Sequence, residues 1–166
     1  MFYKTENKEL QSKYIEYLKL TGSLSRLFSD SLAPYLYYRA AENIFCLGFK
    51  AENLSRSDIS IDAKKENIGF GLKTFLHGNG KTFQKVAEFN AVREEYANKS
   101  DKEIVDFISQ ARNKRLDICL EGYGVESLIY HCLTRTDNLI SVYEFPMDKV
   151  QIDSIKKIVR NKNTIQ

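Results

Sequence analysis

The chain has 166 residues, of which 43% are hydrophobic, and it contains ten Tyr and ten Phe. This length suits a single domain, and the apolar content is sufficient for a substantial core. The net charge is +3, from 25 basic and 22 acidic residues. So mild a balance does not by itself indicate a nucleic-acid partner, and the positions of the charges carry more information than their sum.

Cys46, Cys119 and Cys132 are an odd number of cysteines and lie far apart in the chain. We therefore expect buried thiols rather than a disulfide framework or a structural zinc site. No apolar run reaches the ~18 residues of a membrane span, and the N-terminal segment lacks the apolar core of a signal peptide. These features predict a cytoplasmic protein.

Residues 1–50 are expected to form N-terminal helices. Apolar side chains recur at helical spacing over residues 6–20, which predicts a helix that stops at the Thr-Gly-Ser sequence after it. The apolar stretch over residues 24–49 predicts one or two more helices. Pro34 suits a first helical turn, where its missing N–H costs nothing, and Gly48 is a suitable helix end.

Residues 57–98 are expected to form a β-hairpin followed by a helix. Apolar and polar residues alternate over residues 59–63, which predicts a strand with one apolar face. Residues 64–67 predict a turn, and residues 68–76 predict the second strand of the hairpin. A helix is expected over residues 82–98.

Residues 100–166 are expected to supply the remaining strands and helices. Ser100 and Glu103 form a capping-box pattern, which predicts a helix over residues 101–113. Further strands are expected over residues 116–120, 127–134 and 139–145, and a closing helix over residues 150–159. This order of elements predicts one α/β (α+β) domain over residues 1–166, with a small mixed sheet flanked by helices.

The polar face of the hairpin carries the candidate chemistry. Asp58 and Asp62 lie four residues apart on one expected strand, so their side chains share a face. Lys73, on the second strand, comes close to Asp58 if the turn centres near Glu66. Two carboxylates beside a lysine suit a hard cation with oxygen ligands, and such a site can promote attack of water on a phosphate.

These residues resemble the PD-(D/E)XK nuclease superfamily, which includes most type II restriction endonucleases. In that family an Asp at a strand start is followed, across a hairpin, by an (Asp or Glu)-x-Lys triplet. Ser57-Asp58-Ile59 resembles the first element, and Gly71-Leu72-Lys73 resembles the second. The sequence departs from the pattern at Gly71, which occupies the usual acidic position.

Some members of this family supply the missing carboxylate from the following helix. Glu88 lies fifteen residues after Lys73, a spacing similar to theirs, and Gly71 would leave room for its side chain. Gln84 shares a helix face with Glu88, and Glu42 matches a supporting acid on the preceding helix. The resemblance thus implies the catalytic residues Asp58, Lys73 and Glu88, the metal ligands Asp58, Glu88 and Asp62, and the supporting residues Glu42 and Gln84.

The resemblance implies a restriction-type endonuclease that hydrolyses DNA with Mg²⁺, for which Mn²⁺ can substitute. Cutting both strands of double-stranded DNA needs two sites, so a homodimer is expected. The chain is alternatively a catalytic domain cut from a longer protein. Basic residues near the hairpin are candidates for contacts to DNA phosphates; they are Lys64, Lys65, Lys81 and Lys85.

Two other interpretations fit the same residues. Gly71 is consistent with a domain that kept the nuclease fold, lost the catalytic site and binds DNA or a protein partner. The hairpin charges are also consistent with a solvated face or a cross-strand ion pair in an unrelated α/β domain. Plasmid cleavage in Mg²⁺ by wild type, Lys73→Ala and Glu88→Ala distinguishes the three.

Overall fold

The computed structural model describes residues 1–55, 59–78, 89–161 and 164–165. Its main sheet has five strands, which lie in chain order across the sheet. They are β1 (Glu52–Asn53), β2 (Ala63–Lys65), β3 (Ile68–Leu76), β4 (Ser127–Thr136) and β5 (Leu139–Pro146). A separate two-stranded sheet pairs β6 (Arg160–Asn161) with β7 (Thr164–Ile165).

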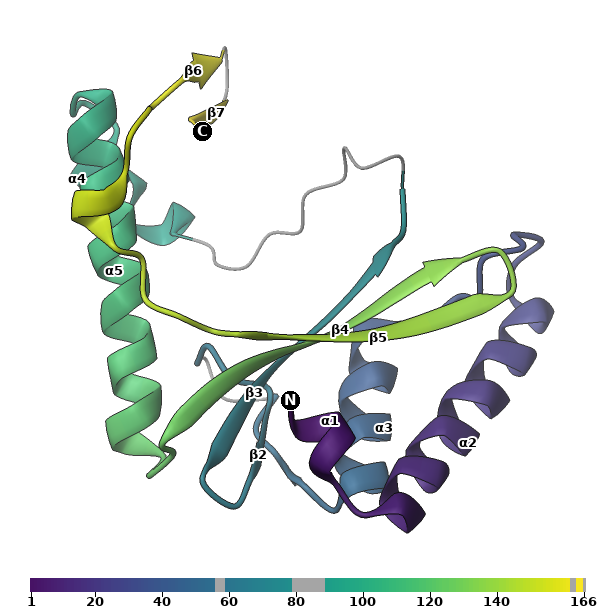
Figure 1. Ribbon diagram of the computed structural model, residues 1–166. Helices are drawn as coiled ribbons and strands as arrows, with labels where there is room; N and C mark the ends of the chain where they lie inside the picture. Colours follow the sequence, from purple (N-terminus) through teal and green to yellow (C-terminus); the bar gives the residue numbers. More distant parts are fainter. Residues whose placement is uncertain (56–58, 79–88, 162–163, 166) are drawn as a thin grey trace.

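Helices flank the main sheet on both sides, which confirms the predicted mixed α+β class (Figure 1). The α-helices are α1 (Phe2–Thr5), α2 (Lys8–Leu24), α3 (Tyr38–Phe49), α4 (Arg93–Tyr96) and α5 (Asp101–Gly122). Short 3₁₀ helices are η1 (Ser25–Leu27), η2 (Asn90–Val92) and η3 (Ile152–Ser154). In Figure 1, α1, α2 and α3 lie on one side of the sheet and α5 lies on the other.

The sheet is mixed because one of its strand pairs is parallel. Strands β1, β2 and β3 are antiparallel neighbours, β3 is parallel to β4 along its whole length, and β4 is antiparallel to β5. A parallel pair needs a connection that returns the chain to the same end of the sheet, and α5 lies within that connection. Strand β2 pairs only with the first three residues of β3, so the second half of β3 has β4 as its neighbour on one side and no β2 pairing on the other.

The first strand of the predicted hairpin is shorter than expected and lies later in the chain, because β2 runs over Ala63–Lys65 rather than residues 59–63. The turn expected over residues 64–67 is therefore limited to residues 66–67. The Asp62 N–H still donates to the Phe70 carbonyl at 2.7 Å. One step further, the Asp62 carboxylate Oδ2 accepts the Leu72 N–H at 2.7 Å. A side chain thus takes the place of the next backbone partner, and the strand pairing ends there. The second strand, residues 68–76, is confirmed.

The core is divided between the two faces of the sheet. Phe70 and Leu72 of β3 pack into the cluster that includes residues of α2 and α3. The largest fully buried members of that cluster are Tyr14, Phe45, Phe49, Phe70 and Leu133. The second cluster includes Ile61, Leu116, Cys119, Leu128 and Met147, and it joins α5 to the sheet.

The N-terminal helices differ from the prediction at three positions. Helix α2 continues through Gly22 to Leu24, and Pro34 lies before α3 instead of in its first turn. Gly48 does not end α3, which runs to Phe49. A Cβ at Gly48 would lie 2.9 Å from Tyr14 Cβ and 3.0 Å from its Cα. The glycine therefore permits close packing of α3 on α2.

The C-terminal half contains two further corrections. The capping box at Ser100 is confirmed, but α5 continues to Gly122, so the strand expected over residues 116–120 is wrong. Leu116, Cys119 and Leu120 lie at helical spacing, and their apolar run fits a helix face as well as a strand. Strands β4 and β5 are confirmed with slightly longer bounds.

The closing helix expected over residues 150–159 is also wrong, since that segment contains only η3. The Asn113 side chain accepts the Val150 N–H at 2.8 Å and donates to the Val150 carbonyl at 2.9 Å. These bonds satisfy backbone groups that a helix would otherwise use. Of the helix expected over residues 82–98, residues 82–88 lie outside the described part, and the remainder contains η2 and α4.

A buried polar network crosses the first cluster; we call it the core network, and it consists of Tyr14, His131 and Glu144. Tyr14 Oη lies 2.8 Å from His131 Nε2, and His131 Nδ1 lies 2.9 Å from Glu144 Oε1. The Tyr3 N–H donates to Glu144 Oε2 at 3.0 Å. Burial raises the pKa of Tyr14 well above its ordinary value, so the hydroxyl keeps its proton. A His131 that accepts from Tyr14 and donates to Glu144 satisfies all three side chains.

Candidate functional site

A polar pocket with a volume of about 570 Å³ opens beside the first half of α3 and the second half of β3. Side chains from α3, the loop before it, β3 and β4 line this polar pocket, together with residues just before β2. They are Tyr35, Leu36, Tyr37, Tyr38, Arg39, Glu42, Ser55, Asp62, Leu72, Lys73, Thr74 and Arg135. The pocket thus contains three residues predicted from the sequence: Glu42, Asp62 and Lys73.

Lys73 is paired with Asp62. Its Nζ lies 3.4 Å from Asp62 Oδ2, the oxygen that also accepts the Leu72 N–H. The side chains of Lys73 and Asp62 are 20% and 21% exposed, so the pair lies at the pocket wall and remains open to solvent. The sequence predicted Asp58 as the closest acid to Lys73, and the described partner of the lysine is Asp62.

Glu42 is a second acid in the pocket and is only 5% exposed. It lies in the second turn of α3, where Arg39 Nη1 donates to its Oε2 at 2.9 Å. The same Arg39 atom also donates to the Ser55 carbonyl. Burial and the nearby negative charge of Asp62 raise the pKa of Glu42, against the opposing effect of Arg39. The ionised form of Glu42 is therefore disfavoured in this pocket.

Cys46 lies one turn after Glu42 on α3. Burial, with smaller contributions from Glu42 and Asp62, raises the pKa of the Cys46 thiol to about 12. Such a thiol is protonated at neutral pH and is a poor nucleophile. Cys119 and Cys132 are buried as well, which confirms the expectation of three buried thiols.

Gly71 is explained by packing against the second cluster, on the face of β3 that it shares with Lys73. A Cβ at this position would lie 2.5 Å from Met147 Cε and 3.1 Å from Tyr130 Cδ1. The room that the sequence suggested for a carboxylate from Glu88 is therefore filled by Met147 and Tyr130. This corrects the expected reason for the glycine, since close approach of other side chains accounts for it.

The remaining predicted site residues lie outside the described part of the chain; they are Asp58, Lys81, Gln84, Lys85 and Glu88. Of the three catalytic residues implied by the resemblance, the structure thus describes Lys73. Within the described ranges, no group of three or more His, Cys, Asp or Glu side chains is arranged to hold a metal ion. The two described carboxylates of the site are Glu42 and Asp62.

Lys64 and Lys65, both predicted to contact DNA phosphates, make contacts within the fold. Lys64 Nζ donates to the Tyr123 carbonyl at 2.6 Å. Lys65 forms an ion pair with Glu6 and lies over the Phe2 ring, 5.6 Å from its centroid. Neither lysine lines the polar pocket, because both belong to the turn end of the β2–β3 hairpin.

Arg39 and Arg135 are the pocket cations that the sequence analysis missed. The signal for Arg39 was its position three residues before Glu42, which places both on one helix face. Arg135 comes from β4 and lies opposite Leu76 of β3, a pairing that depends on the parallel register. Its Nη1 donates to the Pro34 carbonyl at 3.1 Å, and burial lowers its pKa. No hydrogen-bond partner for its buried Nε is found among the described residues.

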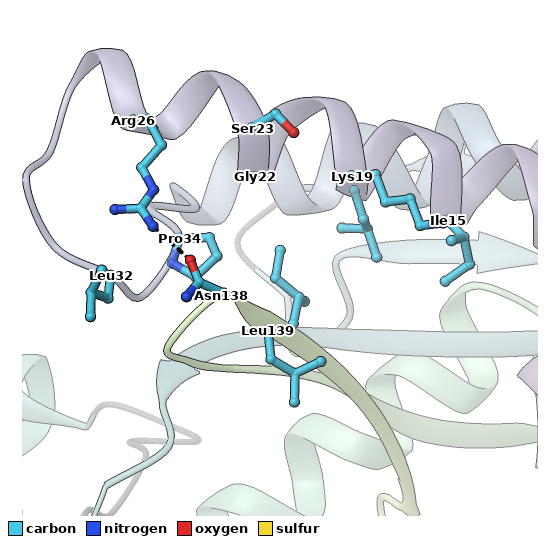
Figure 2. A pocket seen from close by; sticks show the side chains of 11 residues that line it. Ile15, Lys19, Gly22, Ser23, Arg26, Leu32, Pro34, Asn138 and Leu139 are labelled. Atoms are coloured by element: carbon cyan, nitrogen blue, oxygen red, sulfur yellow. Dashed lines mark hydrogen bonds between the residues drawn. The ribbon is translucent and has the colours of Figure 1, made fainter.

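A second hollow, with a volume of about 640 Å³, lies between α2 and the β4–β5 turn (Figure 2). Its described lining is mainly apolar and includes no Asp or Glu. At its rim Arg26 Nη2 donates to Asn138 Oδ1 at 2.6 Å, and the Asn138 N–H donates to the Leu32 carbonyl at 2.9 Å. This hollow is slightly larger than the polar pocket, but none of the predicted site residues lines it.

Comparison of the chain with protein-family models, with curated proteins and with solved structures finds no match. A fold class alone does not determine a function, so the function has to be inferred from the chemistry of the site. Within the described ranges, none of the helices has the length and apolar character needed to cross a membrane.

Proposed function

We propose that the chain is a Mg²⁺-dependent nuclease that hydrolyses DNA phosphodiester bonds in the polar pocket. The carrying observation is the meeting of Lys73, Asp62 and Glu42 in one solvent-accessible pocket, with Lys73 Nζ 3.4 Å from Asp62 Oδ2. These residues come from three separate elements, so a simple cross-strand ion pair does not account for the whole group. Their types match those that the nuclease resemblance implied.

Asp62 and Glu42 supply carboxylate oxygens, the ligand type that Mg²⁺ takes in proteins. This ion is commonly bound through one or two carboxylates, with waters and substrate phosphate completing its coordination. Asp62 and Glu42 would hold it. Burial and, to a smaller extent, the charge of Asp62 raise the pKa of Glu42, and a bound cation would favour the ionised carboxylate. When bound, Mg²⁺ would offset negative charge on the phosphate and make a bound water more acidic.

Lys73 has the central role in this proposal. Its ammonium group would orient the attacking water or offset the negative charge that develops on the phosphate oxygens. Asp62 keeps the ammonium group in place, and the bond from the Leu72 N–H in turn orients the Asp62 carboxylate. The Leu72 N–H thus orients the Asp62 carboxylate, and this carboxylate positions the Lys73 ammonium group.

One observation favours a different function. The acidic position of the family triplet is Gly71, and the space above it is filled by Met147 and Tyr130. A carboxylate cannot be restored there without repacking. The second candidate is therefore a catalytically inactive domain that binds DNA or a protein partner through the same pocket.

Plasmid cleavage in Mg²⁺, with Mn²⁺ as a substitute, tests the proposal. We expect wild type to nick or linearise the plasmid and both Lys73→Ala and Asp62→Asn to lose at least about 100-fold in rate, the scale of removing a group that stabilises transition-state charge. Lys149→Ala is the matched control, because Lys149 forms an exposed ion pair with Asp117 far from the pocket in sequence.

The outcomes separate the two candidates. Equal cleavage by wild type and Lys73→Ala contradicts the nuclease proposal, and DNA binding without cleavage by wild type favours the second candidate.

Cutting both strands of a duplex requires two active sites, so the proposal also includes a homodimer for that reaction. Sedimentation of the protein with and without duplex DNA measures the subunit number.

A further inference from the structure

Three tyrosines at the entrance to α3 are unusually exposed for their size. Tyr35, Tyr37 and Tyr38 are 51%, 48% and 49% exposed, and all three line the polar pocket. The Tyr37 and Tyr38 ring centroids lie 4.4 Å apart, and Arg39 Cζ lies 5.3 Å from the centre of the Tyr38 ring. Clustered aromatic side chains beside a cation are typical of a surface that binds a ligand.

Tyr35 and Tyr37 also line a third hollow, which is apolar and has a volume of about 220 Å³. We call it the apolar slot, and its other walls include Leu24 of α2, Phe28 and Ala40. Phe28 is 78% exposed, so this slot too leaves an aromatic ring open to solvent. The same two tyrosines thus border an apolar slot and a polar pocket.

The charges in the polar pocket favour an anion. Its lining has three cationic residues, Arg39, Lys73 and Arg135, and two acidic ones, Glu42 and Asp62. The buried Nε of Arg135 has no hydrogen-bond partner in the part of the chain that the structure describes. That atom is closed to a ligand, but the Arg135 side chain lines the pocket, and a phosphate oxygen is a suitable acceptor for the other N–H groups of a guanidinium.

We propose that the apolar slot and the polar pocket together bind one unpaired nucleotide of single-stranded DNA, with the base stacked on Tyr37 and the phosphate at Arg135. Aromatic stacking combined with a cationic groove is how proteins bind single strands without reading their sequence. In an intact duplex the base is paired and stacked, so it cannot enter such a slot without being flipped out.

This inference makes the proposed nuclease function more specific. The choice of DNA as the ligand rests on that proposed function. A nuclease with such a slot would act on single strands or on unpaired ends in preference to intact duplex. Hydrolysis of one unpaired strand needs one active site, so this substrate does not require the homodimer that a double-strand break requires.

Binding is tested separately from cleavage by measuring the fluorescence anisotropy of a labelled oligothymidine in EDTA. We expect wild type to bind the single strand more tightly than a blunt duplex. Tyr37→Leu should weaken single-strand binding about 5- to 100-fold, the range that corresponds to losing one stacked base. Tyr37→Phe, which keeps the ring, should bind like wild type. Tyr143→Leu is the matched control, since Tyr143 is 46% exposed on β5 and lines neither hollow.

The phosphate contact is tested by the dependence of binding on salt. Arg135→Met removes one cation, so the slope of log affinity against log salt should fall by about 0.7, the value expected for one phosphate contact on a single strand. Because Arg135 also binds the Pro34 carbonyl, thermal unfolding of this variant must show that it folds. The Tyr37 variants test the base contact independently of this outcome.

Equal affinity for single strand and duplex overturns the inference, and so does unchanged binding by Tyr37→Leu. Single-strand binding that is lost in Tyr37→Leu, in a protein that cleaves neither plasmid nor single strand in Mg²⁺, supports the inference and contradicts the nuclease proposal. Cleavage that depends on Lys73 but is indifferent to Tyr37 supports the nuclease proposal and contradicts the inference. The single-strand inference and the nuclease proposal can therefore be contradicted separately.

Discussion

The core network and the polar pocket are built from similar groups and differ in what surrounds them. In the core network, His131 and Glu144 are 0% and 3% exposed, and each polar side chain has a partner at 3.0 Å or less. In the polar pocket, Lys73 lies 3.4 Å from Asp62 and both remain about one-fifth exposed. The first arrangement is closed, and the second is open to a ligand.

The electrostatic balance also differs between the two clusters. In the pocket, burial and the charge of Asp62 raise the pKa of a second acid, Glu42. Ionising Glu42 there therefore costs free energy. A fully satisfied buried network specifies one packing arrangement, whereas an incompletely satisfied one is typical of a binding site. Acidic and basic side chains in close contact are therefore informative about function only when their solvent access and their unmet interactions are considered.

The largest stability effect should come from the core network. His131→Ala removes a fully buried side chain and leaves Tyr14 and Glu144 without their partner, so we expect a loss of about 3–5 kcal/mol in the free energy of unfolding. Lys73→Ala should cost no more than about 1 kcal/mol, because its ion pair is partly exposed. Urea denaturation of both variants measures the contrast. Equal losses would remove the distinction between the two clusters.

A smaller effect is expected at Gly71. Gly71→Ala places a Cβ 2.5 Å from Met147 Cε, and displacing this side chain should destabilise the protein by about 1–3 kcal/mol. Gly22→Ala is the matched control. There the nearest atom, Ile140 Cδ1, would lie 3.6 Å away, so the helix should gain up to about 1 kcal/mol. Thermal unfolding should show a loss of stability in Gly71→Ala and a gain in Gly22→Ala. Unchanged stability in Gly71→Ala would contradict the packing explanation.

Glu42→Gln should show a pH-dependent effect on stability. Because the pKa of Glu42 is raised in the folded state, that state binds more protons than the unfolded chain at pH values just above the ordinary Glu pKa of about 4.3. Wild type should therefore lose stability relative to Glu42→Gln as the pH rises from about 4 to 7. Urea midpoints across this range measure the difference. The exposed Glu16→Gln serves as control and should show no such trend.

The smallest effect concerns reactivity rather than stability. Since the pKa of the Cys46 thiol is about 12, and all three cysteines are buried, iodoacetamide should modify none of them at pH 8 in the folded protein. In urea all three should react, which mass spectrometry can count. Rapid modification of Cys46 under native conditions would contradict the burial of this thiol in the core.

The fold was predictable where a local pattern matched the final packing. Residues 68–76 alternate as a strand and form one, and the capping box at Ser100 starts a helix in the structure. The pattern was ambiguous over residues 116–120, where an apolar run suits either a strand or a helix. Over residues 59–63 the alternation predicted one apolar face, but Ile61 packs in the second cluster and Ala63 in the first. The Asp62 side chain also replaces the backbone pairing that a longer strand would need.

The candidate site was predictable in part. Lys73 and Asp62 were identified from residue type and spacing and Glu42 from the family resemblance, and the structure places all three in one pocket. Arg135 was not identified, because its proximity depends on a parallel pairing between segments about sixty residues apart. The tyrosines before α3 were not identified either, since exposure of an aromatic side chain is decided by tertiary packing and leaves no local signal.

The parallel pairing of β3 with β4 also has a consequence for how the chain folds. Ile68 pairs with Ser127, so the centre of the sheet cannot close until a long intervening segment has been synthesised. Contacts so distant in sequence slow folding, and meanwhile β3 presents an unpaired edge that other chains can join. Because the association is between chains, refolding at low protein concentration should give a higher yield of monodisperse protein than refolding at high concentration.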